Sequence, residues 1–216
     1  MGKIRDSQKK LAVINDLSGF GRCSVAVELP IISAMKIQCC FVPTAVFSNH
    51  TGFQSFYLED FTERMRPYMK EWEKLELHFQ GICSGFLGSP EQIEIVETFF
   101  KNFKDKDTVV VVDPVRGDYG KMYPTYSLET CQKMRELIPR ADNITPNMTE
   151  ACILGGIPYE EKWTRKRLLW LAEKLSAMGP EKVVITGIIQ GEFIANYCYE
   201  RDGEPRIFRT IKAGTQ

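Results

Sequence analysis

The chain has 216 residues, of which 44% are hydrophobic, 26% charged and 11% aromatic. This composition is typical of a globular protein, because it holds enough apolar side chain to offset the entropy that the backbone loses on folding. Lys and Arg together number 28, as do Asp and Glu, so the formal net charge is zero. Without excess basic charge to release counterions, a nucleic-acid partner is disfavoured. The length predicts one domain, residues 1–216.

The sequence shows no sign of a membrane anchor or an export signal. The apolar run 109–112 ends at Asp113, whereas a spanning helix needs about 20 apolar residues. The polar first ten residues precede no apolar segment. The seven cysteines form no Cys-x-x-Cys pair, and their odd number predicts reduced thiols in a cytoplasmic protein. The adjacent Cys39 and Cys40 could be redox-active, but buried small hydrophobic residues are the favoured interpretation.

Apolar β-branched runs alternate with segments of helical periodicity along the whole chain. Strands are expected at 11–14, 39–47, 77–83, 108–112, 143–145 and 183–186, with extended segments at 192–199 and 206–211. Helices are expected at 23–35, 58–72, from Pro90 onward, 128–138, 149–154 and 165–178. Ser89 is placed to cap the third helix, with Pro90 at its first position. Repeated strand–helix units predict an α/β fold with a parallel, helix-covered sheet, in which ligands bind at the carboxyl ends of the strands.

The first strand is followed by a glycine-rich turn. Gly19 and Gly21 permit a tight turn and close approach of the backbone to a ligand. A dinucleotide-binding pattern would need glycine at position 24, where Ser24 stands, so that function is weakly supported. The second strand leads into the loop 47–53, where small polar residues lie between aromatic ones, a combination that suits a flat polar ring. A loop that satisfies its own backbone is the alternative.

Carboxylates follow the later strands. Asp113 and Asp118 lie on a strand-end loop suited to Mg²⁺, although Asp-Pro also simply ends strands. Asn147 and Glu150 have the spacing of a helix cap, yet a helix N-terminus at this edge is also an anion site. Thr186 adds a hydroxyl at the end of the last core strand. The P-loop and protein-kinase signatures are absent from the sequence.

Four segments together resemble the pyridoxal kinase group of the ribokinase-like superfamily: 47–52, 113–118, 144–150 and 178–186. They occur in the family's order and span essentially the whole chain. The first is typical of vitamin B6 kinases, and the next two are shared with hydroxymethylpyrimidine kinases. The turn 17–23 is similar to that of a bacterial branch of pyridoxine/pyridoxamine kinases. The resemblance implies a three-layer α/β/α sandwich with a mostly parallel central sheet.

The resemblance also implies ATP-dependent phosphorylation of the 5′-hydroxymethyl group of pyridoxal, pyridoxamine or pyridoxine, by a homodimer. On the substrate side, Asp16 or Ser18 would contact the polar edge of the ring, His50 and Thr51 would lie along it, and Phe86 would flank it. Mg²⁺ and phosphate would be arranged by Asp113, Asp118 and Glu150, with Asp113 and Glu150 as the metal ligands. The nucleotide side would be lined by Tyr123, Thr145, Asn147 and Thr186. All these turns are expected to converge on one cleft.

One departure from the family is the catalytic Gly-x-Gly-Asp segment, which does not occur in the chain. The base is therefore expected beyond Gln216, in a C-terminal part missing from the sequence. The 216-residue chain is accordingly expected to be nearly inactive and marginally stable. Two alternatives stay open: a hydroxymethylpyrimidine kinase of thiamine synthesis, and a non-catalytic relic that binds B6 vitamers or nucleotide.

Overall fold

The structure is a computed structural model that describes residues 8–115, 117–122 and 128–212. The chain divides into two compact units, residues 1–109 and 110–216, and each is described by itself. The first combines helices with a mostly parallel sheet, and the second combines helices with both parallel and antiparallel strands, which confirms the predicted α/β fold. Among the described helices, none has the length and apolar character needed to cross a membrane.

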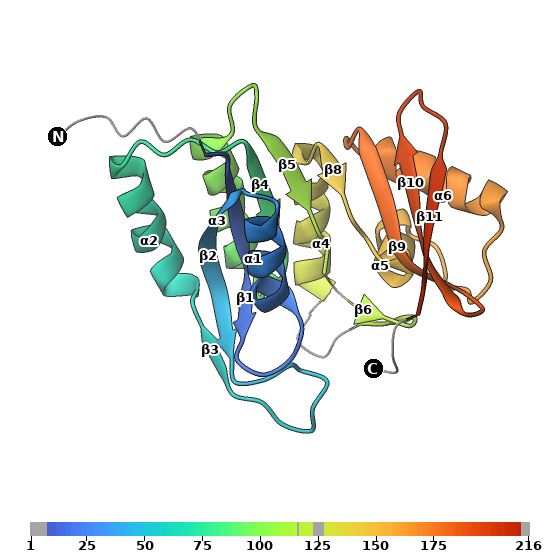
Figure 1. Ribbon diagram of the computed structural model, residues 1–216, viewed down its shortest axis with the longest axis horizontal. Coiled ribbons are helices and arrows are strands. Elements are labelled where there is room, and N and C mark those ends of the chain that lie inside the picture. Colours follow the sequence, from blue (N-terminus) through green and yellow to red (C-terminus); the bar gives the residue numbers. More distant parts are fainter. Residues whose placement is uncertain (1–7, 116, 123–127, 213–216) are drawn as a thin grey trace. The chain divides into compact units, whose positions relative to one another are not determined.

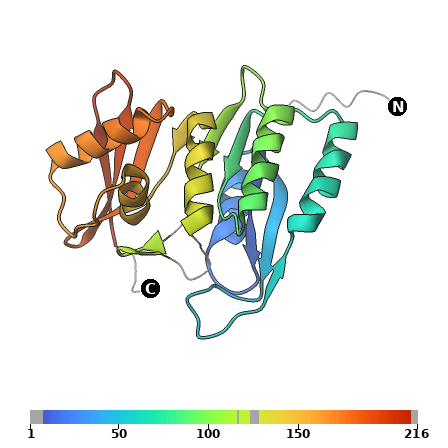
Figure 2. The same ribbon diagram turned by 180° about the vertical axis from the view of Figure 1, so that it is seen from behind.

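The first unit is a three-layer sandwich. Its elements are β1 (Lys10–Ser18), α1 (Ser24–Ala34), β2 (Gln38–Phe47), β3 (Leu58–Asp60), α2 (Thr62–Lys74), β4 (Gly81–Ser84) and α3 (Pro90–Phe103). The strands are ordered β4-β1-β2-β3, with β1 parallel to β2 and β4 and only β3 antiparallel. Helix α1 lies over one face of this sheet, and α2 and α3 lie over the other (Figures 1 and 2).

The core of the first unit forms on both faces of β1. Ala12, Val13 and Ile14 are consecutive, so their side chains alternate between the faces, yet none is more than 1% exposed. On the α2/α3 side, Phe79 packs within 6.1 Å of Phe99, measured between ring centroids. The uninterrupted apolar sequence of this strand is therefore a direct consequence of burial on both sides.

The second unit begins within β5 (Val109–Val112) and contains β6 (Gly117–Asp118), β7 (Lys121–Met122), α4 (Leu128–Leu137), a 3₁₀ turn (Ile138–Arg140), β8 (Asn143–Ile144), α5 (Met148–Gly155), α6 (Arg165–Ser176), β9 (Lys182–Gln190), β10 (Phe193–Glu200) and β11 (Arg206–Ile211). Strands β5, β8 and β9 are parallel, and β9, β10 and β11 continue the sheet as an antiparallel meander. Helices α5 and α6 cover one face of β9 (Figure 2).

The predicted helix 58–72 is wrong at its start. Leu58 to Asp60 pair with β2 as strand β3, and the helix begins at Thr62. The carboxylate of Asp60 accepts a hydrogen bond from the Thr62 amide (2.7 Å), which stabilises the turn into the helix. Helical spacing continues backward through Phe61, so the pattern alone could not reveal the switch. The β6–β7 hairpin was also not predicted.

The adjacent Cys39 and Cys40 are each half-buried, and neither is in a disulfide. Burial, followed by the charges of Cys40 and Glu28, raises the pKa of Cys39 to about 11. Very little of this thiol is ionised at neutral pH, so its reactivity is low.

Candidate active site

The carboxyl end of β1 contains an irregularity that buries polar residues. Asn15 pairs with Pro43 of β2 and Leu17 with Val46, so the register shifts between them. Asn15, Asp16 and Ser18 are 6%, 5% and 4% exposed. A register shift of this kind is a β-bulge, which changes the direction of the side chains around it. Here it coincides with three buried polar side chains.

Asp16 is the centre of a hydrogen-bonded group. Its Oδ1 accepts from the Ser24 hydroxyl (2.6 Å) and its Oδ2 from the Ser18 hydroxyl (3.3 Å). Burial raises the pKa of Asp16, although the two serine hydrogen bonds and the charge of His50 act in the opposite direction. The sequence left Asp16 and Ser18 as alternatives for one role, whereas the structure joins them in one contact.

Asn15 and Glu28 are two members of this site that the sequence did not single out. The Oδ1 of Asn15 accepts from the amides of Asp16 (2.9 Å) and Phe86 (2.8 Å), and its Nδ2 donates to Glu28 (3.1 Å). Burial also raises the pKa of Glu28, and the neighbouring Asp16 charge adds to that effect. A Cβ at Gly85 would lie 2.5 Å from the Asn15 amide, so glycine is required there. The position of Asn15 directly after the apolar residues 11–14 was the sequence signal that could have identified it as a site residue.

The loops after β1 and β2 are hydrogen-bonded to each other. The His50 amide donates to the Phe20 carbonyl (2.8 Å), and the Gly19 amide donates to the Phe47 carbonyl (2.9 Å). A Cβ at Gly21 would lie 2.9 Å from that of His50, so glycine lets the two loops approach closely, and the predicted approach to a ligand stays a prediction. His50 and its loop are therefore held by the glycine turn.

A cavity of about 560 Å³ opens beside these loops, lined by Phe20, Ser48, Asn49, Phe53, Gln54 and Ser55. The rings of Phe20 and Phe53 are 5.5 Å apart. The lining thus has the mixture of aromatic and small polar groups expected of the loop 47–53, with Phe20 added from the first turn.

The five predicted substrate residues do not line this cavity. Asp16 and Ser18 are buried at the end of β1, just before the turn that contains Phe20. His50 and Thr51 are exposed on the loop after β2. The Nδ1 of His50 accepts from the Gly52 amide (3.1 Å). Phe86 contacts Phe47 edge to face at 5.5 Å. Their roles toward a substrate stay predictions.

In the second unit, the carboxyl ends of β5 and β8 lie level with the middle of β9. The Thr145 amide donates to the Val112 carbonyl (3.2 Å), and the Thr186 amide donates to the Pro146 carbonyl (2.9 Å). Asp113 and Thr145 directly follow their strands, as the strand-end argument predicts. The predicted strand end at Thr186 is wrong, because β9 continues to Gln190 through its pairing with β10.

The start of α5 is a complete capping box. The Asn147 side chain accepts from the Glu150 amide (3.0 Å), and the Glu150 carboxylate accepts from the Asn147 amide (2.8 Å). Glu150 is only 3% exposed. The structural interpretation of these two residues is confirmed, and an additional role in binding metal stays a prediction.

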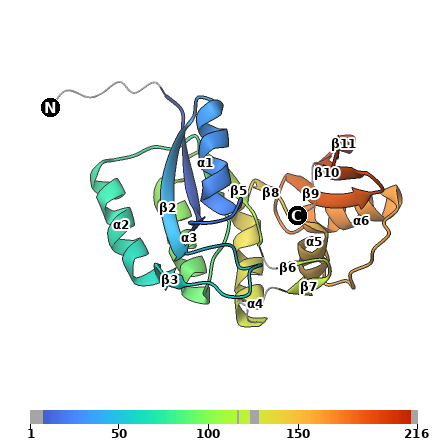
Figure 3. The ribbon, with the colours of Figure 1, turned by 60° about the horizontal axis from the view of Figure 1, so that its bottom comes forward.

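Asp118 lies on the β6–β7 hairpin, which is tied to the same helix (Figure 3). Tyr119 and Gly120 have φ values of 48° and 77°, as a tight two-residue hairpin turn requires. The Gly120 amide donates to the Thr149 hydroxyl (2.8 Å), and Asn147 Nδ2 donates to the Gly117 carbonyl (2.7 Å). Asp118 is thus exposed near the α5 N-terminus. Tyr123, another predicted nucleotide residue, lies outside the described residues.

The predicted Mg²⁺ ligands are compatible with that ion. Within residues 8–115, 117–122 and 128–212, no group of three or more His, Cys, Asp or Glu side chains is arranged to hold a metal. Mg²⁺ is usually bound through one or two carboxylates together with waters and substrate phosphates. The oxygen donors of Asp113 and Glu150 fit an ion that arrives with a nucleotide.

The fold and its polar strand-end loops define a ribokinase-like α/β protein. A family model described as phosphomethylpyrimidine kinase matches residues 28–215, and the chain belongs to this family. Its curated relatives include the thiamine biosynthetic bifunctional enzyme TH1 of Arabidopsis thaliana, 31% identical over 85% of this chain and 34% of that protein. They also include the Arabidopsis thaliana pyridoxal kinase, 27% identical over 76% of this chain and 54% of that protein.

Solved structures agree with this assignment. A provisionally named phosphomethylpyrimidine kinase from Bacteroides thetaiotaomicron, crystallised with pyridoxal, is 42% identical with a TM-score of 0.88, over 94% of this chain and 71% of that one. The Lactobacillus plantarum pyridoxal kinase is 28% identical with a TM-score of 0.85, over 97% and 75%. The resemblance to pyridoxal kinases is confirmed. The chain spans about half or less of the length of the curated relatives described above.

Proposed function

We propose that this protein is an ATP-dependent kinase that phosphorylates the hydroxymethyl group of a vitamin B6 vitamer. The observation that carries the proposal is the aromatic-lined cavity beside the hydrogen-bonded loops that follow β1 and β2. The buried Asp16 carboxylate and His50 belong to the same part of the first unit, although they do not line the cavity. The relative crystallised with pyridoxal, at 42% identity, supports the same substrate class.

On the substrate side, a pyridine ring offers two flat faces and a polar edge. Phe20 and Phe53 supply aromatic surface for the faces. The Asp16 carboxylate, which accepts hydrogen bonds from the Ser18 and Ser24 hydroxyls, would also accept one from a donor at the polar edge of the ring. His50 and Thr51 would lie along the ring on an exposed loop, and Phe86 would flank it.

On the nucleotide side, phosphoryl transfer depends on positioning and on neutralising the phosphate charge. The nucleotide would be lined by Tyr123, Thr145, Asn147 and Thr186. Asp113 and Glu150 would hold Mg²⁺, and Asp118 would help to arrange the ion and the phosphate. The ion would supply charge neutralisation for the phosphates. The chain's own contribution is the rigid edge that the β5, β8 and β9 backbone provides.

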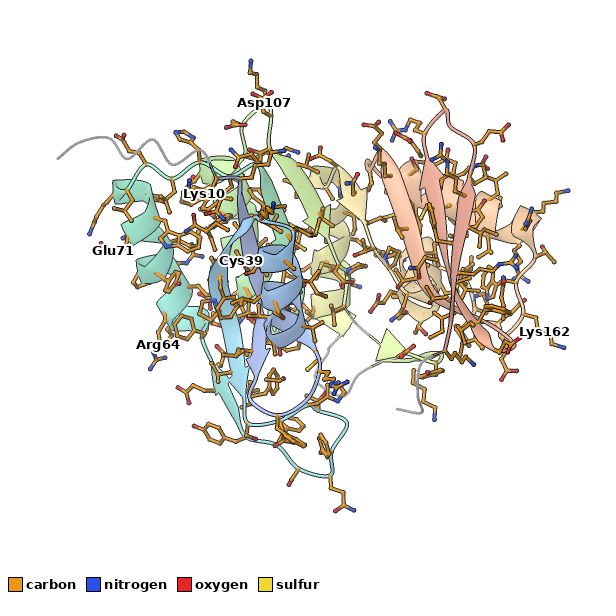
Figure 4. The ribbon with its side chains drawn as sticks, in the orientation of Figure 1. Lys10, Cys39, Arg64, Glu71, Asp107 and Lys162 are labelled. Carbon is orange, nitrogen blue, oxygen red and sulfur yellow. The ribbon has the colours of Figure 1, made fainter. Side chains whose placement is uncertain are left out.

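Calorimetric binding of pyridoxal to the purified chain, alongside an assay of ATP-dependent phosphate transfer, tests the proposal. We expect Asp16→Asn to weaken pyridoxal binding about tenfold, because a hydrogen bond to a charged acceptor is lost. Asp107→Asn is the matched control, since Asp107 is exposed on a distant loop of the same unit (Figure 4). Failure of the chain to bind pyridoxal would reject the substrate assignment. Because the Gly-x-Gly-Asp segment does not occur in these 216 residues, binding without transfer is the result expected of this chain, and robust transfer would contradict the expectation that the base lies outside them.

A hydroxymethylpyrimidine kinase is the second candidate, favoured by the phosphomethylpyrimidine kinase family match and by TH1. Both substrates are flat rings that carry a primary alcohol. Competition between pyridoxal and 4-amino-5-hydroxymethyl-2-methylpyrimidine in the same binding assay separates them. Tighter binding of the pyrimidine would assign the protein to thiamine synthesis.

A further inference from the structure

A second cavity, of about 400 Å³, lies in the second unit between α6 and the strands β10 and β11. It is lined by Arg165, Lys166, Leu169, Tyr197, Pro205, Ile207 and Arg209. None of these residues belongs to the substrate or nucleotide sites proposed above, so the cavity is a separate feature of the molecule.

The cavity is bordered by positive charge. Helix α6 begins with Arg165, Lys166 and Arg167 and has no acidic residue in its first turn. Helix N-termini favour anions, because their free amides carry partial positive charge. Three cations at this position repel that charge, and an anionic ligand would relieve the repulsion.

The cations that line the cavity are in no ion pair among the described residues. Arg167 is ion-paired with Glu160, outside the lining. Within the described part of the chain, Arg165, Lys166 and Arg209 have no carboxylate within ion-pair distance. Arg209 reaches the cavity from β11, opposite the helix, so the cations lie on two sides of the same space.

Tyr197 offers a hydrogen-bond donor to the cavity. The residue is 2% exposed and lines the cavity, and its hydroxyl makes no hydrogen bond to residues 8–115, 117–122 and 128–212. A ligand in the cavity could therefore accept a hydrogen bond from it in place of water. Burial and the Glu173 charge raise the pKa of Tyr197 despite the opposing effect of Arg165, so the hydroxyl keeps its proton and can donate.

The remaining walls are apolar. Leu169 comes from α6, and Ile207 and Pro205 come from β11 and the turn before it. A bare inorganic ion would leave these walls in contact with water. The lining therefore suits a ligand with a charged head and a small apolar body.

We propose that this cavity binds a small organic phosphate monoester. Its phosphate would lie between Arg165, Lys166 and Arg209 and accept a hydrogen bond from Tyr197, while its organic part would pack on Leu169 and Ile207. Two guanidinium groups and an ammonium match a dianionic phosphate better than a single carboxylate, because arginine can donate two parallel hydrogen bonds to phosphate oxygens. The site is independent of the proposed kinase function.

Phenyl phosphate is a suitable probe, measured by calorimetry on the full chain with saturating ATP·Mg²⁺ to occupy the nucleotide site. We expect Arg165→Gln and Arg209→Gln each to weaken binding about tenfold, and Tyr197→Phe about threefold, in line with charged and neutral hydrogen bonds. Binding should also weaken as salt is added. Circular dichroism of each variant confirms that it folds.

Lys162→Gln is the matched control, because it removes one positive charge just before α6 from a side chain that points away from the unit (Figure 4). We expect it to leave phenyl phosphate binding unchanged. Equal losses in the control and the arginine variants, or no loss in any folded variant, would overturn the site. Inorganic phosphate binding as tightly as phenyl phosphate would overturn the organic part of the ligand.

Discussion

Strand β1 of the first unit and strand β10 of the second differ in how their two faces are used. Ala12, Val13 and Ile14 of β1 are all buried, whereas in β10 the buried Ala195, at 1% exposure, adjoins Ile194, at 39%. The same face of the meander also exposes Ile189 and Phe208, at 51% and 58%. Apolar residues that follow one another in a strand can therefore have both faces buried, as in β1, or only one face buried, as in β10. The sequence of the strand alone does not distinguish the two cases.

Matched truncations of one isoleucine in each unit give the largest expected effects. Ile14→Ala should lower the free energy of unfolding by about 2–5 kcal/mol, because it opens a cavity in a closed core. Ile194→Ala should cost less than about 1 kcal/mol, since much of its side chain is already in water. Urea denaturation measures both. Similar costs would mean that the β10 outer face is covered in solution.

Two asparagines sharpen the comparison. Asn15→Ala removes the partner of two backbone amides and of Glu28, and should cost about 3 kcal/mol, because buried groups are left unsatisfied. Asn196 is exposed and accepts one bond from the Gly187 amide (3.3 Å). Asn196→Ala should therefore cost less than about 1 kcal/mol, because water replaces that bond. Equal losses of unfolding free energy would contradict the central role given to Asn15.

The pH dependence of stability provides a test confined to the first unit. Burial raises the folded-state pKa of Asp16 above its ordinary value of 3.8. The folded state therefore loses stability as pH rises from 3.8 to that raised pKa, and the loss is complete above it. Asp16→Asn removes this loss.

We expect the stability of Asp16→Asn relative to the wild type to be highest at neutral pH and to decline as pH falls toward 4. Unfolding by urea at several pH values measures the trend, and Asp107→Asn on an exposed loop should show none of it. A gain that grows toward low pH would reverse the assigned direction.

Surface ion pairs should give the smallest effects in both units. Lys74 pairs with Glu71 on α2, and both side chains are exposed, that of Glu71 on the outer surface (Figure 4). Lys182 pairs with Glu200 across β9 and β10. Exposed pairs gain little, because water screens the charges and ordering two long side chains costs entropy. Neither Lys74→Met nor Lys182→Met should move the urea midpoint measurably. A clear shift at one pair would show that its surroundings are less exposed than the structure indicates.

The order of helices and strands could be predicted because periodicity and caps are local, as with Ser89 and Pro90 of α3. Strand β3 could not, because Leu58 becomes a strand only through its pairing with Phe47. The site divides in the same way. Strand-end positions such as Asp113 and Thr145 follow from topology. The contact of Glu28 with Asn15 joins a helix to a strand, and no local pattern encodes it.

Ser24 adopts a φ of 50° while its hydroxyl donates to Asp16 at 2.6 Å. A left-handed backbone favours glycine, but glycine has no hydroxyl to give the carboxylate. The two demands at this position select different amino acids. Directed evolution for thermal resistance alone should therefore enrich glycine here, whereas selection for ligand capture should retain serine.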